Sequence, residues 1–400
     1  MPSSAGPATA VSTTSLFPDR RPAPTLKIGN LTLDVPVILA PMAGITNTAF
    51  RRLCREYGAG LYVSEMITSR ALVERTPESM RLIRHHESET TRSIQLYGVD
   101  PKTVAAAVTM LVAEDRADHI DLNFGCPVPK VTRKGGGAAL PWKTDLFRAI
   151  VEGAVAAAGD IPLTIKMRKG IDSEHLTYLE AGRIAEGAGV ASIALHARTA
   201  AEFYSGTADW AAIETLKNAV SSVPVLGNGD IWSSDDALRM MRETGADGVV
   251  VGRGCLGRPW LFGDLSSGFS GGADKLEPNL GFVATAFKRH AELLVEFFDG
   301  DEDRACRDIR KHVAWYFKGY SVGGDLRASL ATVQSLAMLD DLLAQLDWTQ
   351  PYPGQDAEGQ RGRAGTPKNP SLPDRWLDSR ELQETDRSEL TEAELHHSGG

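Results

Sequence analysis

The sequence lacks several features that would assign it to a broad class of protein. It contains no run of about 18 apolar residues, the length that a membrane-spanning helix needs. Its four cysteines, at positions 54, 126, 255 and 306, are far apart and include no C-x-x-C pair, which argues against a zinc site or an iron–sulfur cluster. Residues 1–24 lack the basic start and apolar stretch of a signal peptide. We therefore expect a flexible N-terminal arm on a reduced, cytoplasmic protein without a metal ion.

The sequence also lacks the excess of positive charge that is typical of proteins that coat nucleic acids. The formal net charge is -9. From residue 350 onward, Pro and Gly are frequent and 10 acidic residues outnumber 6 basic ones. This composition predicts that residues 349–400 form a mostly disordered acidic tail, with a weak helix over residues 379–395. The positions of the basic residues in the remaining chain then say more about partners than the net charge does.

The sequence does contain a regular alternation of short apolar runs and helix-like segments. Eight runs rich in β-branched residues cover residues 37–40, 60–64, 93–97, 119–123, 162–167, 192–196, 225–227 and 248–251. Helical spacing of apolar residues occurs between them, over residues 103–113, 146–157, 178–188, 210–220 and 235–243. Eight strand–helix units in this length predict a closed (β/α)₈ TIM barrel over residues 25–265. The Gly29-Asn30 pair between apolar residues predicts a hairpin over residues 26–33, ahead of the barrel.

The composition changes after the predicted barrel. Residues 266–280 include a Gly/Ser-rich stretch and are interpreted as a linker. Over residues 281–348 apolar side chains recur at helical spacing, as at Phe287, Ala291 and Leu294. The sequence therefore predicts an α/β barrel followed by a small all-helical C-terminal domain.

Glycines and an arginine follow the last two predicted barrel strands. In such barrels the functional groups lie at the carboxyl ends of the strands, and a phosphate site commonly follows the last two. Asn228-Gly229-Asp230 and Gly252-Arg253-Gly254 occupy these positions, so they predict a phosphate site. The alternative is that the glycines only serve two ordinary turns. The G-x-G-x-x-G pattern at residues 252–257 does not indicate a dinucleotide fold, because no further strand follows it.

Three side chains on other predicted strands suit a flavin. Lys166 lies in an apolar strand, where an ammonium is costly to bury without a partner. A reduced flavin ring carries negative charge and is one such partner; a salt bridge to Asp121 or Glu65 is the alternative. Gln95 suits the donor–acceptor edge of the ring, or is a plain rim residue. His196 suits ribityl or phosphate oxygens, or is a structural histidine.

Cys126 differs from the other cysteines in its setting. It follows a predicted strand, between Gly125 and Pro127, and precedes the basic, glycine-rich segment KVTRKGGG at residues 130–137. Such a segment suits a mobile flap over an anionic substrate, with Lys130 and Arg133 as contacts. A single cysteine is more simply explained as structural, but this setting favours catalysis.

A basic face is predicted on one helix of the C-terminal domain. On a helix through residues 304–318, four basic residues fall on one side together with an aromatic one: Arg304, Arg307, Lys311, Lys318 and Trp315. Ile309, Val313 and Tyr316 would face the core on the opposite side. Basic residues beside an aromatic ring suit RNA, through phosphate contact and base stacking. The alternative is a solvated charged face.

Eight segments together resemble the dihydrouridine synthase family, most closely its bacterial B-type branch. They are LAPMAGITNTAFRRL (39–53), SIQLYG (93–98), DLNFGCPVPKVTRKGGGAAL (121–140), IKMRKG (165–170), LHART (195–199), GNGDI (227–231), VVGRG (250–254) and RKHVAWYFKGY (310–320). Each motif is moderately specific, and all eight in this order are highly so. Asn47, Gly136 and Trp142 depart from the family's usual pattern, and the tail lies outside the resemblance.

The resemblance implies an enzyme that reduces uridine to 5,6-dihydrouridine in the D-loop of tRNA, with FMN as cofactor and NADPH as electron donor. Hydride would pass from the flavin to C6 of the uracil, and Cys126 would deliver a proton to C5, with Asn123 orienting the base. The implied FMN contacts are Pro41, Met42, Ala43, Gln95, Lys166, His196, Asn228, Gly229, Asp230, Gly252 and Arg253. The expected tRNA contacts are Lys130, Arg133, Arg198, Arg304, Arg307, Arg310, Lys311, Trp315 and Lys318. We expect a monomer.

Two other functions remain open from the sequence. An FMN barrel acting on a small molecule, such as a dihydroorotate or enoate oxidoreductase, explains the phosphate site and Lys166 but gives the helical domain no role. The second alternative is a non-catalytic RNA-binding or regulatory protein that retained the barrel.

Overall fold

Eight parallel strands close into a barrel in the computed structural model, which describes residues 23–58, 60–362, 364–384, 386 and 390. The order around the barrel is β10-β3-β4-β5-β6-β7-β8-β9. The strands are β3 (Val37–Leu39), β4 (Leu61–Thr68), β5 (Ser93–Tyr97), β6 (His119–Phe124), β7 (Leu163–Arg168), β8 (Ser192–His196), β9 (Val225–Asn228) and β10 (Gly248–Val251). The eight predicted runs are these eight strands, so the TIM-barrel prediction is confirmed.

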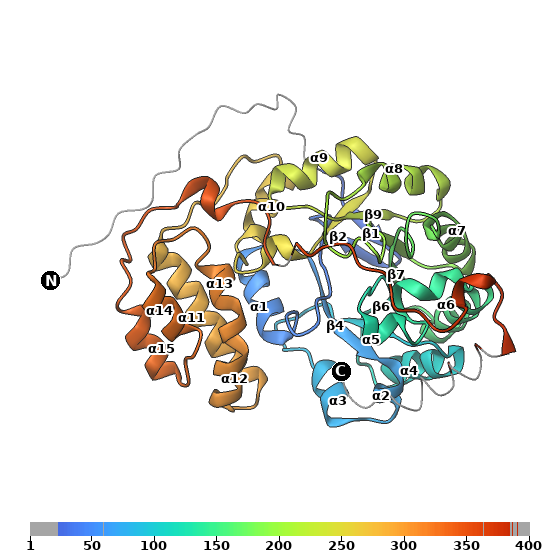
Figure 1. Cartoon of the computed structure of the whole chain (residues 1–400), viewed down its shortest axis with the longest axis horizontal. Helices are drawn as coiled ribbons and strands as arrows, with labels where there is room; N and C mark the ends of the chain where they lie inside the picture. The colour runs from blue at the N-terminus through green and yellow to red at the C-terminus, as the bar shows by residue number, and fades with distance from the viewer. Residues whose placement is uncertain (1–22, 59, 363, 385, 387–389, 391–400) are drawn as a thin grey trace.

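Helices surround the barrel and connect its strands (Figure 1). They are α1 (Thr48–Tyr57), α2 (Ser69–Val73), α3 (Pro77–Leu82), α4 (Pro101–Ala113), α5 (Pro129–Thr132), α6 (Thr144–Ala158), α7 (Tyr178–Ala188), α8 (Trp210–Ala219), α9 (Ser234–Thr244) and α10 (Leu261–Phe269). Their ends follow local sequence signals. In α4, for example, Asp100 accepts a hydrogen bond from the backbone N–H of Thr103, and Pro101 occupies the first turn.

Helix α10 overlaps the predicted linker, so the linker prediction is wrong over its first residues. Ser266, Ser267 and Gly268 lie within the helix despite their low helical propensity. Leu261, Leu265 and Phe269 lie four residues apart, and all three are buried. Burial of this apolar face outweighs the propensity of the Gly and Ser residues, which is why composition alone misplaced the boundary.

The predicted hairpin closes the amino-terminal end of the barrel. It consists of β1 (Leu26–Ile28) and β2 (Leu31–Leu33). Leu26 and Ile28 are buried and belong to the same apolar cluster as Ile38 and Val63 of barrel strands. The carboxyl end of the strands is therefore the end where a ligand can enter.

The C-terminal domain packs against α1 of the barrel, and its helical character is confirmed (Figure 1). Its helices are α11 (Leu280–Phe297), α12 (Glu302–Ile309), α13 (Val313–Tyr316), α14 (Gly324–Leu330) and α15 (Leu336–Leu343). Leu53 of α1 and Trp260 share its apolar core. The single helix expected over residues 304–318 is interrupted by the 3₁₀ turn Arg310–His312, between α12 and α13.

The tail does not behave as its composition predicts. Residues 349–362 and 364–384 run from the helical domain across the barrel toward α6 (Figure 1). Arg361 and Trp376 are buried, and Trp376 belongs to the main apolar core of the barrel. The prediction of disorder is therefore wrong for these residues. The predicted helix over residues 379–395 lies mostly outside the described residues, as does nearly all of the N-terminal arm.

No helix in the described part of the chain is long and apolar enough to cross a membrane.

Candidate active site

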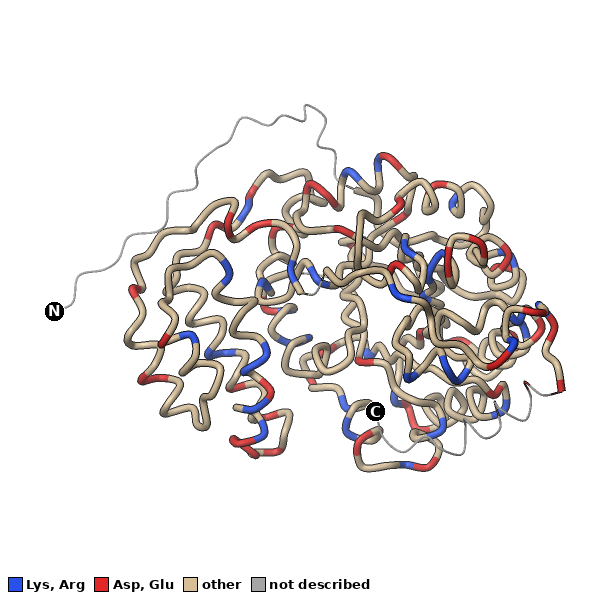
Figure 2. Tube along the Cα trace, in the orientation of Figure 1, with Lys and Arg blue, Asp and Glu red and all other residues tan. Residues whose placement is uncertain are grey.

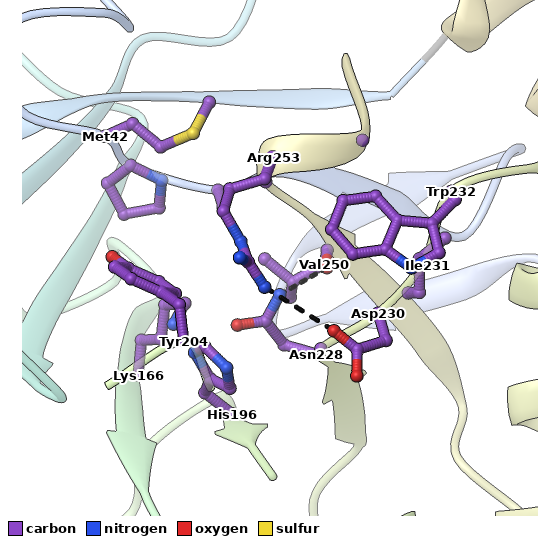
Figure 3. Close-up of a pocket in the computed structure, with 15 residues that line it drawn as sticks. Met42, Lys166, His196, Tyr204, Asn228, Asp230, Ile231, Trp232, Val250 and Arg253 are labelled. Carbon is purple, nitrogen blue, oxygen red and sulfur yellow. Dashed lines mark hydrogen bonds and ion pairs between the residues drawn. The ribbon is translucent and has the colours of Figure 1, made fainter. Parts of the chain in front are cut away.

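A pocket opens at the carboxyl ends of five barrel strands and contains most of the residues that the sequence assigned to a cofactor (Figure 3). The predicted residues that line it are Pro41, Met42, Lys166, His196, Asn228, Gly229, Asp230, Gly252 and Arg253. We call it the mouth pocket. Two predicted contacts lie elsewhere. Ala43 lines a neighbouring cleft, and Gln95 is fully buried below the rim, so its contact with a cofactor stays a prediction.

Two glycines expose backbone in the lining of the mouth pocket. Gly229 has φ of +123°, and a Cβ atom there would lie 2.8 Å from the Cβ of Ala208. A Cβ atom at Gly252 would lie 3.4 Å from the Cβ of Ala40. Backbone without side chains is what an anionic group needs in order to approach closely. The loop after β9 is held by Asp230, whose carboxylate accepts from the backbone N–H of Ala208 at 2.7 Å.

Two aromatic rings flank Arg253. Its guanidinium carbon lies 4.5 Å from the ring centre of Tyr204 and 5.2 Å from that of Trp232, and Asp230 pairs with it at 3.5 Å. Figure 3 shows the side chain extending toward Asn228 and Asp230. Stacking and pairing restrict the arginine to one direction. Sequence reasoning missed Tyr204 and Trp232, although both lie in loops that follow barrel strands.

The mouth pocket concentrates positive charge. Burial, and after it repulsion from Arg168, lowers the pKa of Lys166 to about 8. Burial likewise lowers the pKa of Arg168 to about 10, with Arg198 and Arg253 adding to the effect. The pKa of His196 falls well below its ordinary value because of burial and then of Arg168 and Lys166, so His196 is neutral at pH 7. Mutual repulsion of this kind is relieved when an anion binds.

Two observations show that these residues fit a bound anionic cofactor. The Nε2 atom of His196 is buried and has no hydrogen-bond partner among the described residues, although buried polar atoms are nearly always paired. The carboxylates that were alternative partners for Lys166 are engaged elsewhere. Asp121 accepts from Thr164 and Gln95, and Glu65 accepts from the backbone of Gly44. Among the described residues no ion pair joins Lys166 to either carboxylate, although Asp121 is near enough to raise its pKa, so the ammonium is available to a ligand.

A chain of buried hydrogen bonds runs from the barrel interior to the rim. The carboxylate of Asp121 accepts from the Thr164 hydroxyl at 2.6 Å and from the Gln95 amide at 2.7 Å. The Gln95 oxygen in turn accepts from the Asn123 amide at 2.8 Å. Burial raises the pKa of Asp121 to about 6, and these two bonds oppose the rise. The amide of Asn123 is thereby held in one orientation.

Asn123 fixes the start of the loop that carries Cys126. Its side-chain oxygen accepts from the backbone N–H of Gly125 at 3.0 Å and from that of Cys126 at 2.9 Å. Arg168 holds the same turn from the other side, donating from Nε to the Gly125 carbonyl at 2.9 Å. Cys126 is half-buried, whereas the other three cysteines are buried. Burial raises the pKa of its thiol, with Arg168 and Lys166 among the opposing influences.

Cys126 also lines a cleft of about 610 Å³ that reaches from the barrel to the helical domain. We call it the interdomain cleft. Lys130, Arg304, Arg307 and Lys311 line it, together with the rings of Phe297 and Phe298. Figure 2 shows basic segments on both sides of this region, interspersed with acidic ones.

Only part of the predicted basic face faces the cleft, because the 3₁₀ turn between α12 and α13 rotates the later residues away. Lys318 donates to the carbonyls of Glu358 and Gln360 in the tail. Arg310 donates to the Val333 carbonyl, and Trp315 packs half-buried against His312. The placements of Lys318 and Trp315 contradict the single face that the sequence predicted, and Arg310, predicted separately as a tRNA contact, is engaged within the helical domain. Ile309, Val313 and Tyr316 do face the core, as predicted.

Two further predicted tRNA contacts lie away from the cleft lining. Arg198 is 1% exposed and donates to the Ser205 carbonyl and to Asp230, so it supports the loops of the mouth pocket. Its predicted role as a substrate contact stays a prediction. Arg133 is exposed on the loop after Cys126, outside the lining of the cleft.

A protein-family model described as "Dihydrouridine synthase (Dus)" matches residues 38–348. The chain belongs to the dihydrouridine synthase family. The "Probable tRNA-dihydrouridine synthase" of Mycobacterium tuberculosis is 55% identical over 366 residues, which cover 89% of this chain and 93% of that protein. The "tRNA-dihydrouridine synthase B" of Xanthomonas campestris is 39% identical over 303 residues, covering 76% of this chain and 90% of that protein. As a member of this family the chain is an enzyme, and the resemblance seen in its motifs is confirmed.

Among solved structures, that of TcOYE with pHBA aligns with a TM-score of 0.48 at 10% identity, covering 61% of this chain and 92% of the other. A likeness at this level carries no argument about function. In the part of the chain that the structure describes, no group of three or more His, Cys, Asp or Glu side chains is placed to hold a metal ion.

We expect the Cys126 thiol to stay protonated at neutral pH, because burial raises its pKa above the ordinary value. Iodoacetamide reacts with the thiolate, so the alkylation rate of Cys126 reports its ionisation. The rate, measured by mass spectrometry of the Cys126 peptide, should rise with a midpoint at higher pH than that of a cysteine in a short unstructured peptide. A midpoint at or below the peptide value would contradict this assignment.

Proposed function

We propose that the protein is an FMN-dependent, NADPH-driven tRNA-dihydrouridine synthase that reduces uridine to 5,6-dihydrouridine in the D-loop of tRNA, with Cys126 as the proton donor. Relatives that match most of the chain are named as tRNA-dihydrouridine synthases. The observation that carries the proposal is the position of Cys126. Asn123 fixes its loop at the carboxyl end of β6, Cys126 lies near enough to Lys166 and Arg168 for both to act on its pKa, and it lines the interdomain cleft.

The residues of the mouth pocket divide into two groups toward FMN. Gly229, Gly252 and Arg253 would hold the phosphate, since they combine thin backbone with a guanidinium that is already oriented. The free Nε2 of His196 would bond to a ribityl or phosphate oxygen. When bound and reduced by NADPH, the flavin supplies the hydride that C6 of the uracil accepts.

Lys166 supplies a fixed positive charge in the mouth pocket. Its pKa of about 8 leaves the side chain mostly protonated at pH 7, and a neighbouring anion would raise that pKa again. A preorganised cation of this kind stabilises negative charge without reorganisation of solvent. Lys166 therefore favours the reduced, anionic form of the cofactor.

Cys126 acts as the acid. Because the pKa of its thiol is raised, the proton resides on Sγ at neutral pH and is available to C5 as negative charge develops on the base. Asn123 keeps the loop in place through the backbone N–H groups of Gly125 and Cys126. The resulting thiolate regains its proton from solvent through the interdomain cleft. Over one turnover, uridine, NADPH and a proton give dihydrouridine and NADP⁺.

The interdomain cleft suits an RNA strand with one base extruded. A uracil within a folded tRNA must leave its stack to reach a thiol at the rim of a barrel. Arg304, Arg307 and Lys311 supply positive charge for phosphates along one wall. Phe297 and Phe298 offer rings for stacking, and the Arg304 guanidinium carbon lies 4.5 Å from the Phe298 ring centre.

We expect Cys126→Ala to retain FMN and NADPH oxidation but to form dihydrouridine about 10²–10⁴-fold more slowly, the range for loss of a general acid. Dihydrouridine is measured in unmodified tRNA transcripts by mass spectrometry. Cys306→Ala, which removes a buried thiol from α12, serves as the matched control and should keep its activity. Turnover by Cys126→Ala within about twofold of the wild type would exclude Cys126 as the proton donor.

Reversal of charge at Arg307 should weaken tRNA binding without altering the flavin spectrum. The side chain is 60% exposed, and its ion pair within the described part of the chain is with Asp303 on the same helix, so Arg307→Glu leaves the fold intact. We expect the Kd for tRNA to rise about tenfold at low salt, with a shallower salt dependence. Lys27→Glu makes the same charge change at the closed end of the barrel and should bind like the wild type. Equal Kd values for the two variants would remove α12 from the interface.

A further inference from the structure

The C-terminal segment crosses the barrel from the mouth pocket to the loop that follows Cys126. We call residues 361–386, apart from the undescribed 363 and 385, the C-terminal strap. Figure 1 shows it leaving the side of the helical domain and passing over the barrel toward α6. Midway, the backbone N–H of Lys368 donates to the Ala201 carbonyl at 2.9 Å. The strap therefore has contacts along its length.

One end of the strap is anchored beside the mouth pocket. The buried guanidinium of Arg361 donates to the carbonyls of Leu256, Trp315 and Ala357. The next residue, Gly362, packs on the aliphatic part of Arg253, where an added Cβ atom would lie 3.5 Å from Cδ. This end of the strap lies against the 3₁₀ turn Arg253–Cys255, which comes after β10 and contains the arginine proposed to bind phosphate.

The other end is anchored by Trp376, which is 1% exposed. Its indole N–H donates to the Ala139 carbonyl at 3.0 Å. The ring also lies directly against Gly135, where an added Cβ atom would come within 2.7 Å of it. Gly135 and Ala139 both belong to the segment that follows Cys126. Trp376 thus fills a space that only a glycine at position 135 leaves open.

Lys143 is the last residue of the same segment, and its side chain binds residues of the strap. The side chain is fully buried, and its ammonium donates to the carbonyls of Ser379 at 3.0 Å and Glu381 at 3.2 Å. It also pairs with the Asp386 carboxylate at 2.8 Å and lies 4.8 Å from the Trp376 ring centre. A buried ammonium is tolerated only when it is paired in this way. Without the strap, Lys143 would have to leave its site.

The anchored segment contacts Cys126 directly. The backbone N–H of Ala138 donates to the Cys126 carbonyl at 3.0 Å. Gly137 has φ of +56° and lies so close that an added Cβ atom would be 3.0 Å from the Cβ of Cys126. Three consecutive glycines at residues 135–137 make this segment costly to order by itself. Asn123 holds the amino side of Cys126, so the segment over 135–143 is what holds its carboxyl side.

We propose that Trp376 and Lys143 are positioning residues for Cys126, acting through the glycine-rich segment that the C-terminal strap clamps against the barrel. The catalytic role of the Cys126 thiol rests on the proposed function. The contacts by which the strap holds Cys126 in place do not depend on that function. Loss of the clamp lets the segment open locally, which exposes Cys126 and misplaces its thiol.

The test is the alkylation rate of Cys126 in the full-length protein carrying Trp376→Ala. We expect about a tenfold faster reaction than in the wild type, because local opening exposes the thiol. The other three cysteines, all buried, should keep their wild-type rates. The matched control is Trp348→Ala, which removes another indole that donates to a carbonyl, that of Leu343, in the helical domain. A Cys126 rate in Trp376→Ala equal to the rate in Trp348→Ala would overturn the proposal.

A second variant covers the case in which Trp376→Ala does not fold. Trp376→Phe keeps an apolar ring against Gly135 and removes only the bond to the Ala139 carbonyl. We expect about a threefold faster alkylation of Cys126, in keeping with the loss of one buried hydrogen bond. Acceleration of all four cysteines together would indicate global unfolding and would also count against a local clamp.

Activity separates this proposal from the proposed function. In Trp376→Ala, kcat for uridine reduction should fall about tenfold while KM for tRNA changes less than about twofold, because the clamp acts on the reacting thiol and not on the RNA contacts. A rise in KM alone would contradict a positioning role. If the wild type itself reduces no tRNA uridine, the proposed function fails, whereas the alkylation rates still decide whether the strap holds Cys126.

Discussion

The active-site geometry depends on two hydrogen bonds that the Asn123 side-chain oxygen accepts from consecutive backbone N–H groups, those of Gly125 and Cys126. These bonds join the rigid interior of the barrel to the loop that carries Cys126. Asn123 is oriented by Gln95, and Gln95 by Asp121, so the position of the thiol is set by buried strand residues and not by the loop alone. A fully paired network of this kind in a low-dielectric interior is stiff, and stiffness is what a proton donor needs.

The barrel must provide positive charge to bind an anionic cofactor and, close by, must keep the thiol of Cys126 protonated. Lys166 and Arg253 line the mouth pocket and make it positive, which suits a phosphate and a reduced flavin, and Arg168 lies near Lys166. A positive field also favours a thiolate, yet burial outweighs it and leaves Cys126 with a raised pKa. An acid and an anion site can therefore coexist in one barrel mouth, because desolvation acts more strongly on the thiol than the neighbouring cations do.

Much of the fold and of the candidate site could be predicted because both follow from strand periodicity. Once eight strands are placed, residues such as His196 and Arg253 fall at the carboxyl ends, where the mouth pocket forms. Two of the predictions that were wrong are the disorder of the tail and the continuous helix over residues 304–318. Trp376 orders the tail by packing on Gly135, and a 3₁₀ turn at Arg310–His312 divides a helix whose periodicity looked continuous. Composition and spacing carry no signal for the contact between Trp376 and Gly135, because these residues are far apart in the sequence.

A single turnover with the FMN-loaded protein tests directly whether the reduced cofactor passes its hydride to a uridine of tRNA. The flavin is reduced in the absence of oxygen, the excess reductant is removed, and tRNA lacking dihydrouridine is added while the flavin absorbance is followed. Added tRNA should accelerate flavin reoxidation, and the amount of dihydrouridine formed should equal the amount of flavin oxidised. Reoxidation no faster than in buffer, with no dihydrouridine in the tRNA, would contradict this transfer of hydride.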